Sequence, residues 1–96
     1  MQAIHLLHGG DAGYLALQAA RWQAALSGVY LARSIAHEPP NVINPASLAQ
    51  RAAELAAESG LKLRVLNAVD LQALGAGALL AVGQGSQSGA RLIVLE

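Results

Sequence analysis

Histidines near the amino terminus are the first residues of this chain that could do chemistry. His5 and His8 lie three positions apart, so on a helix both imidazoles would share one face, as in part of a zinc site. A zinc site needs three or four protein ligands, and neither a cysteine nor a suitably spaced third ligand accompanies this pair. We therefore expect no metal-binding role for His5 and His8.

The pair His37-Glu38 resembles the start of the His-Glu-x-x-His helix of zinc peptidases. Pro39 and Pro40 follow directly and cannot continue a helix, and position 41 is Asn instead of His. Zinc hydrolysis by that route is excluded. Glu38 alone could act as an acid or base, but a single carboxylate without a partner favours a solvated side chain or an acceptor for nearby amides.

A glycine-rich segment at residues 83–89 could cradle a phosphate. A dinucleotide site needs a helix that begins at the glycines, whereas the apolar run after this segment indicates a strand. The Lys-Ser/Thr pair of a P-loop is also missing. The segment nearly matches the Gly-x-Ser-x-Gly elbow of serine hydrolases, but Gln87 occupies the place of the reactive serine. We interpret residues 83–91 as a connecting loop, with nucleotide binding as a weaker alternative.

Two helices are predicted before the first strand. Residues 12–36 follow a capping residue, Asp11, and have apolar residues at helical spacing on more than one face, which predicts a helix buried in a larger assembly. The main stripe consists of Leu15, Ala19, Trp22, Leu26 and Val29. We expect Trp22 to be a core or interface anchor. Residues 1–11 contain a possible short strand at residues 3–7, which ends at a Gly-Gly turn.

The segment His-Glu-Pro-Pro-Asn-Val-Ile-Asn-Pro at residues 37–45 organises the chain, because it ends one helix and begins the next. Pro39 and Pro40 stop the first helix. Asn44 can cap free amides, and Pro45 has the backbone φ angle of a first helical residue. A second, amphipathic helix is therefore predicted at residues 45–59, with Gly60 as its left-handed end.

The second half of the chain predicts a small α/β arrangement. Residues 61–66 alternate between apolar and basic side chains, which indicates a half-exposed strand. Asn67 can cap a short helix that continues to Leu74. The continuous apolar run at residues 78–82 is predicted to be a strand covered on both faces, and residues 92–95 a further strand. The expected fold class is α/β: a partial mixed-sheet α/β/α unit in the order helix, helix, strand, helix, strand, strand.

Composition narrows the classes of function. At 96 residues the chain forms one domain at most, and its six basic and six acidic residues cancel without clustering, which argues against a nucleic-acid partner. The absence of cysteine excludes disulfides and fits a reducing compartment. Arg21 and Arg33 interrupt the only long apolar segment, so we expect no membrane span. The amino terminus lacks the charged start and the apolar run of a secretory signal, so we expect no such signal.

Three ordered segments carry a family resemblance over roughly residues 26–96. They are the segment at residues 37–45, then Gly-Ala-Gly-Ala-Leu-Leu-Ala-Val-Gly-Gln-Gly-Ser at 75–86, and Arg-Leu-Ile-Val-Leu-Glu at 91–96. Together they resemble the leucine aminopeptidases, which are cytosolic two-metal exopeptidases. In that family Asn is usual at the position of His37 and Met at that of Ala76, and both departures affect local packing. The resemblance implies an interdomain helix at residues 12–36 and the first portion of the catalytic domain at residues 37–96.

The resemblance also implies a function for the complete protein: removal of the amino-terminal residue from peptides, with two divalent metals such as manganese or zinc, in a cytoplasmic homohexamer. The metal-binding carboxylates and lysine of the family lie in segments downstream of the Leu-Ile-Val-Leu-Glu strand. We therefore assign no catalytic, cofactor-binding or metal residue to this chain, and expect a truncated member or fragment that is inactive alone. The alternative is a non-catalytic packing module that associates with an aminopeptidase or with itself.

Overall fold

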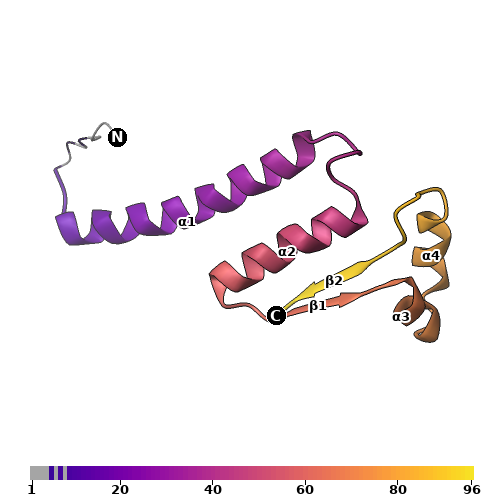
Figure 1. Cartoon of the computed structure of the whole chain (residues 1–96). Helices are drawn as coiled ribbons and strands as arrows, with labels where there is room; N and C mark the ends of the chain where they lie inside the picture. The colour runs from indigo at the N-terminus through magenta and orange to yellow at the C-terminus, as the bar shows by residue number, and fades with distance from the viewer. Residues whose placement is uncertain (1–4, 6, 8) are drawn as a thin grey trace. The chain divides into compact units, whose positions relative to one another are not determined.

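A computed structural model of the chain describes residues 5, 7 and 9–96 (Figure 1). The elements in chain order are α1 (Ala12–His37), α2 (Pro45–Ser59), β1 (Leu63–Leu66), α3 (Ala68–Ala73), α4 (Gly77–Gly83) and β2 (Leu92–Leu95). The chain divides into two compact units, Met1–His37 and Glu38–Glu96. The strand predicted at residues 3–7 falls mostly outside the described residues. No helix in the described part of the chain has the length and apolar composition needed to cross a bilayer.

The first unit contains α1, a helix of 26 residues, which confirms the helix predicted at residues 12–36 and extends it by one. Its start is capped as predicted, because the Asp11 carboxylate accepts hydrogen bonds from the backbone N–H groups of Gly13 (2.6 Å) and Tyr14 (3.0 Å). No residue of α1 is buried, and Trp22 is 69% exposed. Helical periodicity therefore predicted the element correctly, while no described residue of this unit covers its apolar faces.

In the second unit, α2 is fixed at both ends by its own sequence. The Asn44 side-chain oxygen accepts from the N–H groups of Ala46 (3.0 Å) and Ser47 (3.2 Å), and the Asn44 N–H donates to Ser47 Oγ (2.9 Å). This reciprocal arrangement is a capping box. At the other end Gly60 adopts a φ of 68°, the left-handed conformation that favours glycine. The predicted helix at residues 45–59 is confirmed.

The sheet of this unit has two antiparallel strands, β1 and β2. Leu63 pairs with Leu95 and Leu66 pairs with Leu92, and the backbones of Lys62 and Glu96 exchange hydrogen bonds of 2.7 and 2.9 Å just beyond the strands. Helix α2 packs against both strands, and α3 contacts β1 (Figure 1). The last strand is confirmed at residues 92–95, and the predicted strand at 61–66 begins two residues later, at Leu63.

The apolar run at residues 78–82 was predicted to be a strand, and this prediction is wrong: the run lies in α4, which packs against α3. Four of its five residues are Ala or Leu, which favour helix, and only Val82 is β-branched. A short continuous apolar run has no periodicity that distinguishes a strand from a helix, so composition decides. The fold class remains α/β, but α4 replaces one strand and the sheet has two strands.

The core of the described chain is small. Ala49 and Ala56, both on α2, are 8% and 5% exposed, and Leu71 of α3 is fully buried. Alanines on α2 allow its backbone to approach the sheet closely, but each buries little apolar area. Leu71 is therefore the one large side chain that is entirely removed from water among the described residues.

Candidate functional site

One segment that carries the family resemblance, at residues 37–45, meets the loop before β2 at the start of α2. The glycine loop, which we define as residues 84–91 between α4 and β2, places Ser88 beside Asn44. The Ser88 hydroxyl donates to the Asn44 side-chain oxygen at 3.4 Å, and the two residues are 44 positions apart in sequence and partly buried. Asn44 was predicted as the cap of α2, but no local signal in the sequence indicated its contact with Ser88.

The glycine loop is closed tightly where it leaves α4. A Cβ atom on Gly83 would lie 2.7 Å from the Cβ of Ala90, so the two ends of the loop approach each other more closely than any larger residue at position 83 allows. The Ser86 N–H donates to the carbonyl of Gly83 at the end of α4 (3.1 Å), and the Ser88 N–H donates to Ser86 Oγ within the loop (3.1 Å). These two amides point to acceptors in the loop and at its base, which favours its interpretation as a connection over a phosphate cradle. It connects a helix to a strand, because α4 replaces the predicted strand.

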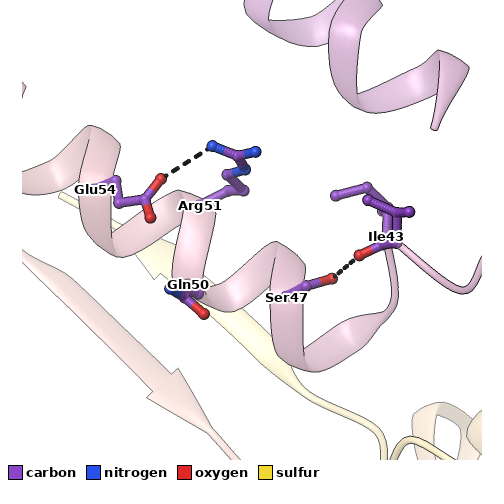
Figure 2. A pocket seen from close by; sticks show the side chains of 6 residues that line it. Ile43, Ser47, Gln50, Arg51 and Glu54 are labelled. Carbon is purple, nitrogen blue, oxygen red and sulfur yellow. Dashed lines mark hydrogen bonds and ion pairs between the residues drawn. The ribbon is translucent and has the colours of Figure 1, made fainter.

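A polar hollow lies along the first turns of α2. It is lined by Val42, Ile43, Ser47, Gln50, Arg51 and Glu54. Figure 2 shows Arg51 and Glu54 forming an ion pair, with 3.3 Å between Nη1 and Oε2, while Ser47 Oγ donates to the Val42 carbonyl at 2.7 Å. Both charged side chains are more than half exposed, so water screens the pair. The hollow contains no hydroxyl held by a basic side chain, so its geometry does not support nucleophilic catalysis.

The histidines and acids considered as metal ligands or catalytic groups are dispersed. Residues 5, 7 and 9–96 contain no group of three or more His, Cys, Asp or Glu that could hold a metal ion. His5 is exposed, and the possible pair with His8 falls outside the described residues. His37 is the last residue of α1, where its Nδ1 donates to the Arg33 carbonyl at 2.7 Å, and Glu38 is exposed beyond the helix end. The residues described here therefore do not fit a two-metal centre.

An apolar hollow on α1 forms a separate feature of the first unit. It is lined by Trp22, Ala25, Leu26 and Val29, which lie on one side of the helix. The three large side chains among them are each more than half exposed. Trp22 is not a core residue among the described residues of this unit, and its role as an interface anchor stays a prediction.

Comparison with known proteins identifies the family. The sequence model of the cytosol aminopeptidase family, catalytic domain, matches residues 30–96. A probable cytosol aminopeptidase of Parasynechococcus marenigrum is 51% identical over 72 residues, which cover 75% of this chain and 15% of the relative. Probable cytosol aminopeptidases of Nitrosomonas eutropha and Syntrophotalea carbinolica are 43% and 54% identical, over 100% and 72% of this chain and 20% and 14% of their own lengths. No solved structure matches.

The matches confirm the resemblance drawn from the three sequence segments, and the family model begins within α1, at residue 30. The chain spans only about one seventh to one fifth of the length of these curated relatives. The match over residues 30–96 covers more than half of the chain and includes both α2 and the sheet. The chain therefore belongs to the cytosol aminopeptidase family.

Proposed function

We propose that this chain provides framework for an aminopeptidase catalytic domain and has no catalytic activity alone. In the complete protein, that domain removes amino-terminal residues from peptides in the cytoplasm. The family match over residues 30–96 carries this proposal. The second unit supports it, because its capped helix and sheet form an organised scaffold without a cluster of reactive side chains among the described residues.

The family is one of metallopeptidases, and the complete enzyme is expected to use two divalent cations such as manganese or zinc. Such a centre needs several oxygen or nitrogen ligands that converge on one cavity. The acids of the second unit do not converge: Glu54 pairs with Arg51, and Asp70 accepts from the Asn67 N–H at 2.9 Å in the cap of α3. We propose that the ligands come from parts of the complete protein outside these residues. We also propose that the complete protein assembles as a homohexamer.

The proposed lack of activity is tested with the purified 96-residue chain. Hydrolysis of leucine p-nitroanilide is measured with Mn²⁺ or Zn²⁺, and bound metal is measured by mass spectrometry after dialysis. We expect no hydrolysis above the metal-only rate and no stoichiometric metal. The full-length Syntrophotalea carbinolica relative serves as the active control. Metal-dependent hydrolysis by the chain, or one tightly bound ion per chain, would contradict the proposal.

The proposed role as framework for the catalytic domain is tested by a chimera. The segment of the Syntrophotalea carbinolica relative that aligns with this chain is replaced by the corresponding residues of this chain, at 54% identity. If these residues serve as framework, the chimera retains metal binding and hydrolyses the same substrate within about tenfold of the parent rate, because no reacting group changes. A folded chimera that binds metal but has lost more than a thousandfold in rate would show that the replaced segment contains a catalytic group.

A second candidate function is a packing module that associates with an aminopeptidase or with itself. The observation that favours it is α1, which has no buried residue and an apolar hollow at Trp22, Leu26 and Val29. Size-exclusion chromatography with light scattering distinguishes the two functions. A monodisperse oligomer with a helical circular dichroism spectrum supports the module, whereas aggregation or an unfolded spectrum supports a dependent portion of a larger domain.

A further inference from the structure

The contact between Ser88 and Asn44 connects two parts of the second unit that are otherwise held by local interactions. The Asn44 side-chain oxygen serves the cap of α2, where it accepts from Ala46 and Ser47. The Ser88 hydroxyl approaches the same oxygen at 3.4 Å, longer than the 3.0 and 3.2 Å of the capping bonds. An amide oxygen has two lone pairs, so a third donor necessarily shares the acceptor. The cap therefore does not depend on Ser88.

The glycine loop does depend on outside contacts for its position. Its local hydrogen bonds, from Ser86 to Gly83 at the end of α4 and from Ser88 to Ser86, span two or three residues and set only local turns. The close approach of Gly83 to Ala90 fixes the loop at its base. Gly85, Gln87 and Gly89 are exposed, whereas Ser88 is half-buried. Ser88 thus connects the body of the loop to the start of α2 through a side-chain hydrogen bond.

We infer that Ser88 is a positioning residue, which orders the glycine loop against the start of α2 through the Asn44 side chain. The segment at residues 37–45 and the glycine loop then behave as one unit: the cap holds the loop, and the loop leaves the cap unchanged. This inference does not depend on the proposed peptidase function, because it concerns the order of a loop within the chain itself.

Amide hydrogen exchange of the full 96-residue chain, read residue by residue by NMR, tests this inference. Ser88→Ala is expected to speed exchange at residues 85–89 about three- to tenfold, as the loss of one hydrogen bond implies, and to leave the amides of α2 unchanged. Ser88→Thr, which retains a hydroxyl, should restore the parent rates. Ser86→Ala is the matched control within the loop, and should affect the Ser88 amide without affecting the others.

The partner is tested by changing Asn44. Asn44→Asp retains both the cap and the acceptor, so loop exchange should stay within about twofold of the parent. Asn44→Gly removes the acceptor but costs the cap little, and should speed loop exchange as much as Ser88→Ala does. The double variant should add nothing further to the loop. Unchanged loop exchange in Ser88→Ala, an equal increase over the whole second unit, additive effects of the two changes, or a parent loop without protection would each overturn the inference.

Discussion

Helices α1 and α2 differ in what holds them, although both begin at a capping residue predicted from sequence. Helix α1 has 26 residues, none of which is buried. Helix α2 has 15 residues, packs against the sheet of the second unit, and has Ala49 and Ala56 buried. Helices in proteins owe most of their stability to packing of an apolar face. The comparison teaches that the longer helix has the weaker support within its own unit, despite its larger supply of apolar side chains.

The largest expected effect lies in the core of the second unit. Leu71→Ala should lower its free energy of unfolding by about 2–5 kcal/mol, because Leu71 is fully buried and the truncation leaves a cavity. Urea unfolding followed by circular dichroism measures this loss. Leu74→Ala is the matched control, since that side chain is 62% exposed, and should change the free energy by less than about 0.5 kcal/mol. Equal effects of the two changes would contradict the assignment of the core.

The base of the glycine loop should give the next largest effect. Gly83→Ala introduces a Cβ 2.7 Å from the Ala90 Cβ, and overpacking of this kind costs about 1–3 kcal/mol. Ala90→Gly in the same chain removes the clashing atom and should recover most of the loss in thermal or urea unfolding. Gly85→Ala, where the added Cβ meets no atom within 4 Å, is the control. A loss that persists in the double variant would mean that the clash is not its cause.

Removal of the cap of α2 should give an intermediate loss of stability, which measures how much the capping residue contributes to this helix. Asn44→Ala is expected to destabilise the second unit by about 1 kcal/mol, since it removes the acceptor for the first amides of the helix. Asn44→Asp retains the acceptor and should be nearly neutral. The midpoint of urea unfolding, at an unchanged slope, reports the difference. A neutral alanine variant would show that the capping bonds seen here do not stabilise the helix.

The smallest expected effect lies in α1, where the informative result is whether helicity rises or falls. Trp22 is 69% exposed, so Trp22→Ala removes little buried area within its unit and exchanges a poor helix former for the best one. Far-UV circular dichroism should show equal or higher helicity, which corresponds to about 0.5 kcal/mol or less. A clear loss of helicity would contradict the weaker support of α1, because it would show that α1 is packed against another surface in solution.

Local chemistry explains which parts of the fold could be predicted. The bounds of α2 follow from Asn44, Pro45 and Gly60, whose backbone preferences act within a few residues. The same holds for the capping box at Asn67 and Asp70 of α3. The run at residues 78–82 was mistaken for a strand because its pattern is compatible with burial in either conformation, and its packing on α3 is not visible in sequence.

The sequence alone was sufficient for the family, for the ends of α1, α2 and α3 to within one residue, and for the approximate positions of β1 and β2, because each depends on residue types at short spacing. The tertiary structure was needed to show that residues 77–83 form a helix and that β1 pairs with β2 in antiparallel register. It alone brought Ser88 to Asn44 across 44 positions of chain. Contacts between distant residues depend on how whole elements pack, and no periodicity within one element encodes them.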